Sequence, residues 1–162
     1  MAFVQNGTCS DENVLRGTWG PVGDDETLAR IVKRPEHFDS KGQVKPGLFP
    51  RSHITKTGLS VTRMEKIQNI EFATYAHAVA EMKFGQKLAG VRKVLTSRIR
   101  QIRDENLGRA FCVIEDPEPA FDNVPANEAH AVAITSLPLE QEDEIIRLQM
   151  ELAKAFSELA PI

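Results

Sequence analysis

The sequence predicts an α+β fold, a small mixed or antiparallel sheet packed by two main helices. Short apolar segments typical of strands recur between loops, one longer segment has helical spacing, and an amphipathic C-terminal helix ends the chain. The 162 residues suit one domain, which we place at residues 27–162. An irregular acidic segment, residues 1–26, precedes it.

The first two strands flank a long loop. Residues 27–33 form a short apolar run before Pro35, which predicts a strand. Residues 34–58 contain three prolines and three glycines, and a loop of this length in a small domain is often functional. Residues 58–63 alternate apolar and polar side chains, which predicts a second strand.

The central part of the chain combines one helix with an ambiguous segment. Apolar side chains in residues 64–84 fall on two stripes at helical spacing, so a well-buried helix is expected there, with Gly85 as its stop. Residues 88–103 fit either a helix or a strand over 91–95 followed by a short turn of helix. We favour the strand.

Two further strands and a helix complete the chain. Residues 110–115 and 129–135 are apolar runs that predict strands, separated by a loop rich in Pro and Asn. The last helix is expected to begin at Pro138 and to stop before Pro161. Acidic residues near its start suit the helix dipole.

The last helix carries one apolar stripe, formed by Ile145, Leu148, Leu152, Phe156 and Leu159. Such a stripe must be covered, because five exposed apolar side chains would drive association. The stripe spans about two heptads, less than a convincing coiled coil needs. Packing within the chain is therefore favoured, and a protein partner or a homodimer docked on this helix is the alternative.

The net charge of −3 hides an uneven distribution. Residues 27–110 are basic by 10 charges, whereas the two ends together are acidic by 13. We favour the interpretation in which the acidic ends fold against the basic middle and neutralise it. The alternative is that the basic middle binds an anionic ligand. The totals do not describe a strongly basic nucleic-acid binder, although they do not exclude nucleic acid.

Composition also bears on location. No apolar run approaches the roughly 20 residues that span a bilayer, so no membrane association is expected. The first residues lack the features of a secretory signal. Cys112 lies in an apolar segment and is expected to be a buried thiol, far in sequence from Cys9. These observations predict a cytoplasmic protein without a metal site, since no Cys/His ligand spacing occurs.

Two groups of polar residues are candidates for a functional site. Arg51, Ser52 and His53 lie on the Gly/Pro-rich loop, with Arg63 beyond it, and these side chains suit an anionic group. Glu128 and His130 precede the last predicted strand, where they are suited to acid–base chemistry.

The two other histidines are not expected to act. His37 follows the first strand and is expected to be exposed and without a role. His77 lies in a mostly apolar helix and is expected to be a hydrogen-bonded core residue.

A third pattern spans the predicted strands. Arg30 lies on the first strand, Ser60-Val61-Thr62 on the second, and Glu128 before a later one. This order resembles the Arg, Ser-x-Thr/Ser, Glu order of toxin-type ADP-ribosyltransferases. The resemblance implies that Arg30 binds the phosphates of NAD, that the Ser60 strand shapes a nicotinamide pocket, and that Glu128 stabilises charge on the ribose. The chain departs from the family in having His130 where a second Glu is common.

Three functions follow, and the residues leave open whether the protein is an enzyme. The first is a small cytosolic protein with a loop-built Arg/His site for an anionic ligand, a nucleotide or another phosphate-containing molecule. Its expected ligand-binding residues are Arg30, Arg51, Ser52, Ser60 and Arg63, and its expected catalytic residues are Glu128, His130 and His53. The second is an ADP-ribosyltransferase-like enzyme that uses NAD. The third is a non-catalytic module that docks through its C-terminal helix.

Overall fold

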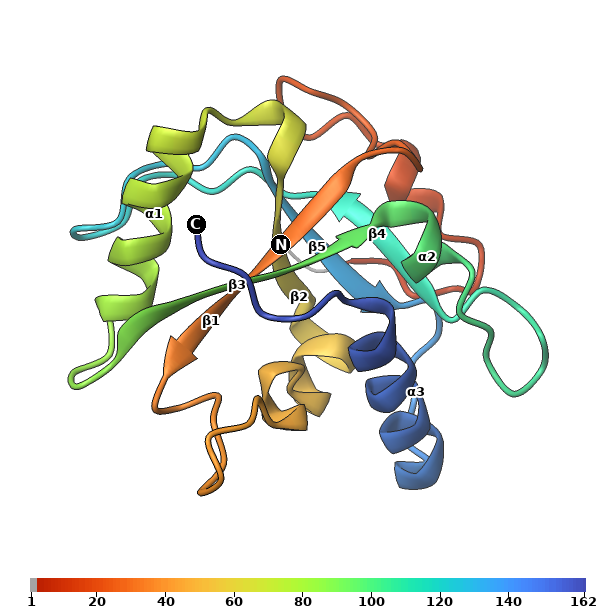
Figure 1. The fold of residues 1–162 in the computed structure, drawn as a ribbon. Helices are drawn as coiled ribbons and strands as arrows, with labels where there is room; N and C mark the ends of the chain where they lie inside the picture. The colour runs from red at the N-terminus through yellow and green to blue at the C-terminus, as the bar shows by residue number, and fades with distance from the viewer. Residues whose placement is uncertain (1–2) are drawn as a thin grey trace.

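The computed structural model describes residues 3–162 and contains a five-stranded antiparallel sheet with the order β3-β1-β2-β5-β4 (Figure 1). The strands are β1 (Thr27–Arg34), β2 (Leu59–Arg63), β3 (Lys87–Leu95), β4 (Phe111–Glu115) and β5 (His130–Thr135). The predicted α+β class is confirmed, and the ambiguous segment contains a strand followed by a short helix, as favoured.

Three helices accompany the sheet: α1 (Asn69–Glu81), α2 (Thr96–Arg100) and α3 (Glu142–Ala155). Figure 1 shows α1 and α3 on opposite sides of the molecule. Strand side chains alternate between the two faces of a sheet. Accordingly, Ala29 packs in the cluster that contains residues of α1, whereas Leu28 packs in the cluster that contains residues of α3.

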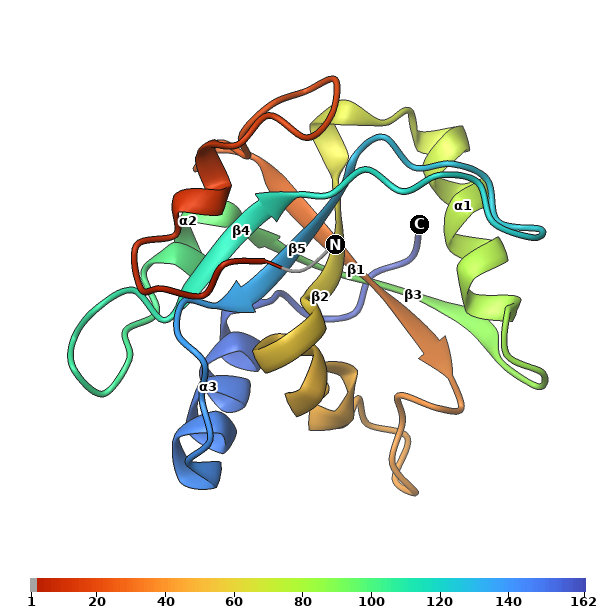
Figure 2. The ribbon, with the colours of Figure 1, turned by 180° about the vertical axis from the view of Figure 1, so that it is seen from behind.

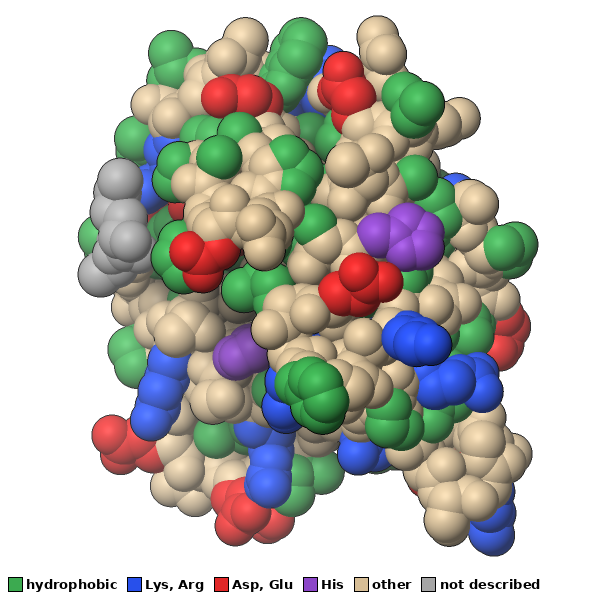
Figure 3. All heavy atoms as spheres, turned by 90° about the vertical axis from the view of Figure 1, so that its left-hand side faces the viewer, with side chains coloured by type: hydrophobic (Ala, Val, Ile, Leu, Met, Phe, Trp, Pro, Cys, Tyr) green, Lys and Arg blue, Asp and Glu red, His purple; other side chains and the backbone are tan. Residues whose placement is uncertain are grey.

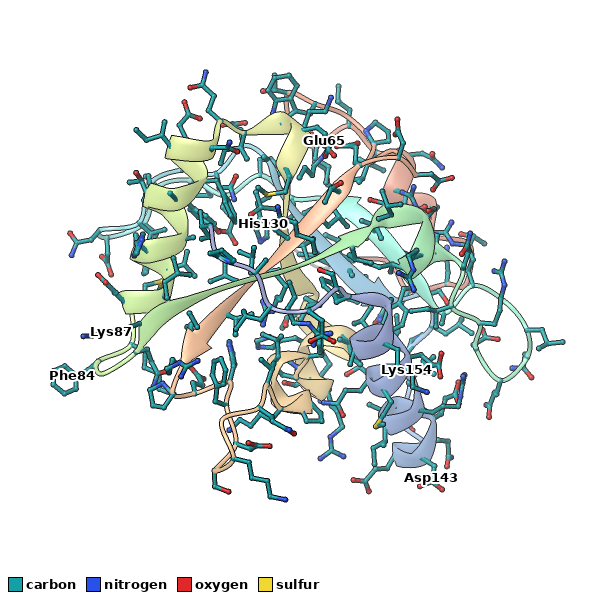
Figure 4. All side chains as sticks on the ribbon, viewed as in Figure 1. Glu65, Phe84, Lys87, His130, Asp143 and Lys154 are labelled. Carbon is teal, nitrogen blue, oxygen red and sulfur yellow. A yellow bond between two sulfur atoms is a disulfide. The ribbon has the colours of Figure 1, made fainter. Side chains whose placement is uncertain are left out.

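The first long helix is shorter than the predicted 64–84. A short 3-10 turn occupies Met64–Lys66, and the chain is extended at Ile67 before α1 begins. After α1 the chain turns at Gly85, which has a positive φ, and enters β3. Phe84 therefore lies at the tip of the connection with its ring fully exposed (Figure 4).

The apolar stripe of α3 is covered by the protein itself. Leu148 and Leu152 are fully buried, and the ring of Phe156 lies 4.9 Å from that of Phe49. This agrees with the favoured packing within the chain, so the face is not free for docking. α3 begins at Glu142 rather than at Pro138, and Leu159 lies beyond its end.

The N-terminal segment is fastened to β4, along which it runs in Figure 2. Cys9 and Cys112 form a disulfide, so the expectation of a buried free thiol at Cys112 is wrong. The two cysteines are 103 residues apart, and only the folded sheet brings them together. Glu12 accepts a hydrogen bond from the Val113 N–H at 2.7 Å and pairs with Arg100 at 3.2 Å.

Ion pairs join the acidic ends to the basic middle, as favoured from the charge distribution. Besides Glu12, Glu26 pairs with Arg63 at 2.8 Å, and Glu142 pairs with Arg51 at 2.7 Å.

None of the helices within residues 3–162 combines the length and the apolar character that a membrane-spanning helix requires.

The sheet opens between β1 and β2. These strands pair at only two positions, Leu28 with Arg63 and Ala29 with Thr62, whereas β1 pairs with β3 along its whole length. Beyond Ala29 the two strands no longer pair, and Arg30 and Ser60 lie where the pairing ends. This opening positions the candidate site.

Candidate functional site

A cleft of about 480 Å³ lies at this opening. Side chains from β1, β2, β5 and α1 line it, together with the loops that follow β1 and β4. Four of the eight site residues expected from the sequence line it: Arg30, His53, Ser60 and His130. Figure 3 shows the α1 side of the molecule, where lysine and arginine side chains gather in the lower half.

Arg30 is the central basic group of the cleft. Its Nε and Nη2 atoms donate to the Leu48 carbonyl at 3.2 and 3.1 Å, and Nη1 donates to the Ser60 carbonyl at 3.1 Å. Burial lowers the pKa of Arg30 to about 10, so the guanidinium is still charged at neutral pH. None of the carboxylates in residues 3–162 forms an ion pair with it.

Three further nitrogen-bearing side chains surround Arg30. Lys33 lines the cleft and pairs with Glu36 at 3.0 Å. His37 is buried, contrary to expectation, and its Nδ1 accepts the Lys33 N–H at 2.9 Å. Burial, with repulsion from Arg30 and Lys33, lowers the pKa of His37 to about 4 and also lowers the pKa of His53. Burial and the positive charges at the basic end of the cleft thus both favour the neutral form of the two histidines.

The other end of the cleft is acidic and contains His130 near the middle of the molecule (Figure 4). The Tyr75 hydroxyl donates to Glu118 Oε2 at 2.9 Å. Burial and the Glu118 carboxylate raise the pKa of Tyr75. The Nε2 atom of His130 lies 3.0 Å from Glu118 Oε1, and its Nδ1 lies 2.6 Å from the Asp116 carbonyl oxygen. The hydrogen bond to His130 lowers the pKa of the Asp116 carboxyl.

Backbone pairing fixes this acidic end. Glu118 and Asn127 exchange two backbone hydrogen bonds, at 3.0 and 2.9 Å, which hold the loop after β4 as a narrow hairpin. The Asn127 amide donates to the Thr62 hydroxyl at 3.0 Å and so ties that hairpin to β2. Thr62 in turn lies opposite His130 in the β2–β5 register.

Arg63 lies outside the cleft and is structural. Its side chain is 1% exposed and is enclosed by Glu26, Glu115 and the carbonyl of Gly20. Burial alone would raise the pKa of Glu26, but hydrogen bonds from Arg63 and from the Gly23 N–H outweigh it and lower that pKa. The expectation that Arg63 binds ligand therefore finds no support, because its donors are already used inside the protein.

The three remaining expected residues are also elsewhere. Arg51 and Ser52 are exposed in a separate depression near the start of α3, where Arg51 pairs with Glu142. Glu128 is exposed beside α1 in another depression lined by Ile67 and Ile70. These side chains do not join the cleft that holds Arg30.

Sequence reasoning missed three residues of the cleft. Tyr75 lies in the segment whose apolar stripes predicted only a buried helix, and His77, expected in the core of that helix, is exposed instead. His37 was expected to have no role. One feature of the sequence could have indicated Glu118 as a site residue: it is an acidic residue between Pro117 and Pro119 in a long loop.

The arrangement provides two kinds of chemistry within one cavity. Arg30 offers a guanidinium fork for an anion, and Glu118 with His130 offers groups that gain and lose protons. Apolar and aromatic side chains form much of the remaining wall, including Ile31 and Phe121. Compared with known proteins, the chain matches no family model, no curated protein and no solved structure.

Proposed function

We propose that the cleft binds a phosphate-containing small molecule, such as a nucleotide, with Arg30 as the anion-binding residue. The observation that carries this proposal is the electrostatic state of Arg30. It is a partly buried cation whose hydrogen-bond partners are carbonyl oxygens rather than a carboxylate. A buried charge is costly unless it is paired, so a bound anion would stabilise it.

The donor geometry agrees with this assignment. A guanidinium has five N–H groups, and Arg30 uses three of them in hydrogen bonds to carbonyls. Two N–H groups remain for a ligand. Planar guanidinium forks match phosphate oxygens well, and two donors are enough for a bidentate contact.

The size and walls of the cleft suit a nucleotide. Ligand cavities commonly enclose about 300–1,000 Å³, and this one encloses about 480 Å³. The rings of Tyr75 and Phe121 line it and offer flat apolar surfaces to a base.

Isothermal titration calorimetry with ADP tests the proposal. The Arg30→Gln variant should lose at least tenfold in affinity, because the bidentate phosphate contact is removed. The matched control is Arg51→Gln, which removes the same charge outside the cleft and should change the affinity less than twofold. Circular dichroism confirms that both variants are folded. Equal ADP affinity of Arg30→Gln and wild type would refute the assignment of Arg30.

The second candidate function is an ADP-ribosyltransferase-like activity with NAD. It is favoured by the position of Arg30, Ser60 and Thr62, which all line the same cleft. Glu128, which the resemblance would make catalytic, lies outside that cleft, whereas Glu118 lies inside it. Release of nicotinamide from NAD, dependent on Arg30, would support this candidate, and NAD that binds without being consumed would remove it.

The Cys9–Cys112 disulfide bears on where the protein acts. Structural disulfides persist mainly in oxidising compartments. An oxidising compartment is therefore the alternative to the cytoplasmic location expected from the sequence. Counting reactive thiols in protein taken directly from cells distinguishes the two. Two free thiols support the cytoplasm, and none supports an oxidising compartment.

A further inference from the structure

Glu118 is the carboxylate of the cleft that is both fixed and accessible. Tyr75 Oη donates to its Oε2 atom at 2.9 Å, while His130 Nε2 lies 3.0 Å from Oε1. Two backbone hydrogen bonds with Asn127, one donated and one accepted, hold the main chain of Glu118. The side chain nevertheless remains 40% exposed and lines the cavity. A ligand in the cleft can therefore reach a carboxylate whose orientation is already set.

The geometry requires a proton between Glu118 and His130. The Asp116 carbonyl, 2.6 Å from Nδ1, can only accept, so Nδ1 carries hydrogen. In a neutral ring of that tautomer, Nε2 would present a lone pair to the Glu118 oxygen 3.0 Å away. Two acceptors repel at this distance. One proton therefore belongs to the pair, and we place it on Nε2, where it faces the Glu118 carboxylate.

The environment of Nε2 supports this conclusion. The atom is buried and makes no hydrogen bond to another described residue, although Glu118 Oε1 lies 3.0 Å away. Its side chain is 2% exposed. A buried nitrogen of this kind is unusual in a folded protein and calls for a partner. Glu118, which also lines the cleft, is the carboxylate in contact with this nitrogen.

This proton pair lies within one small ligand of the anion-binding residue. Arg30 contacts β2 at the Ser60 carbonyl, and His130 pairs with Thr62, two residues further along β2. Two residues of a strand span about 7 Å, and neighbouring strands lie about 5 Å apart. A phosphate held by Arg30 and an attacking water that faces Glu118 thus fit within this cleft.

We propose that Glu118 is the general acid–base residue of a phosphoester-cleaving reaction in this cleft, positioned by Tyr75 and His130. The inference rests on the proposed binding of phosphate by Arg30. Water attacks phosphorus, forming a new P–O bond while the P–O bond to the ester oxygen breaks. Glu118 takes one proton from the water and passes it to solvent, and the departing oxygen, on the opposite side of phosphorus, takes up one proton from solvent. The products are an alcohol and the corresponding phosphate, with no change of oxidation state. The His130 proton stabilises the carboxylate throughout and is not consumed.

The test uses 4-nitrophenyl phosphate and bis(4-nitrophenyl) phosphate as probes, with wild-type protein and matched Glu→Gln variants. Wild type should release 4-nitrophenol from at least one probe. Glu118→Gln should lower kcat at least about 100-fold, the scale of general acid–base catalysis, while ADP still binds. Glu71→Gln, an exposed change on α1, is the control and should keep both properties.

A spectroscopic measurement separates proton holding from a merely structural role of His130. Nitrogen-15 NMR of the His130 ring should show protons on both nitrogens in wild type, and Glu118→Gln should leave Nε2 unprotonated. An unprotonated Nε2 in wild type would overturn the proton pair.

The outcomes distinguish this inference from the proposed function. ADP binding without hydrolysis of either probe overturns the acid–base role and leaves the binding site intact. Absence of ADP binding by wild type overturns the proposed function itself. Loss of turnover in Glu128→Gln, with normal turnover in Glu118→Gln, would move the acid–base role to the carboxylate outside the cleft and refute the inference.

Discussion

Arg63 provides a direct comparison between a buried ion pair and an exposed one. Its guanidinium is 1% exposed and lies 2.8 Å from Glu26 and 3.4 Å from Glu115. Arg63→Met would leave both carboxylates buried without their cation, which costs about 3–5 kcal/mol. Arg51 pairs with Glu142 at 2.7 Å, but these side chains are 50% and 74% exposed. Such a surface pair contributes about 0.2–1 kcal/mol.

Urea unfolding at pH 7, with the disulfide intact and the far-ultraviolet circular dichroism as signal, measures the two free energies. For a chain of this size each kcal/mol lowers the melting temperature by about 2–4 °C. Arg63→Met should therefore melt roughly 6–20 °C below wild type, and Arg51→Met at most about 4 °C below it. Similar decreases in the free energy of unfolding for the two variants, or a decrease below about 1 kcal/mol for Arg63→Met, would refute the structural role of Arg63. Arg63 would then again be a candidate for ligand binding.

Three further predictions concern the fold. Leu152→Asp should cost more than about 3 kcal/mol, because it places a carboxylate in the core, and thermal melts with light scattering should show an unfolded or unstable monomer. Replacing both Cys9 and Cys112 with Ser should lower the free energy of unfolding in guanidinium chloride by about 4.7 kcal/mol, the loop-entropy value for a closed loop of this length. A hydrogen bond from Arg147 lowers the pKa of Glu144, so the stabilisation by Glu144 is present above its unfolded pKa and lost as the pH falls through the folded one. The stability difference between wild type and Glu144→Gln should accordingly shrink from pH 5 to pH 3.

Each of these has its own control. Ile146 lies on α3 with 38% exposure, so Ile146→Asp should stay within about 0.5 kcal/mol of wild type. A stable Leu152→Asp monomer would contradict the burial of the α3 stripe. Reductant that leaves wild type fully stable would contradict the disulfide prediction, and a difference for Glu144→Gln that is constant with pH would contradict the third.

The strands were predictable because their signals are local. The alternation of side chains in residues 58–63 and the apolar runs at 110–115 and 129–135 depend only on neighbouring residues. Boundaries were less predictable, since tertiary contacts decide them. The α1 helix ends at Glu81, and the chain then turns into β3. The local pattern in residues 82–84 does not predict that the helix ends before them.

The candidate site was predictable only in part, for a physical reason. Arg30, Ser60 and His130 lie on strands that pair or adjoin in the sheet, so a strand-based pattern found them. Glu118 and Tyr75 enter the cleft from a loop and a helix, and their meeting depends on the hairpin held by Asn127. Such convergence between distant elements has no signature in a single sequence.

The central claim is that the Arg30 cleft binds a phosphate-containing ligand, and an NMR titration tests it most directly. ADP is added to nitrogen-15-labelled protein while the backbone amide shifts are followed. The account predicts saturable shift changes concentrated at Ile31, Ser60, Thr62 and Glu118, which line the cleft. Changes concentrated at the basic groove formed by Arg98, Arg103 and Lys154, or no saturable change up to millimolar ADP, would contradict it.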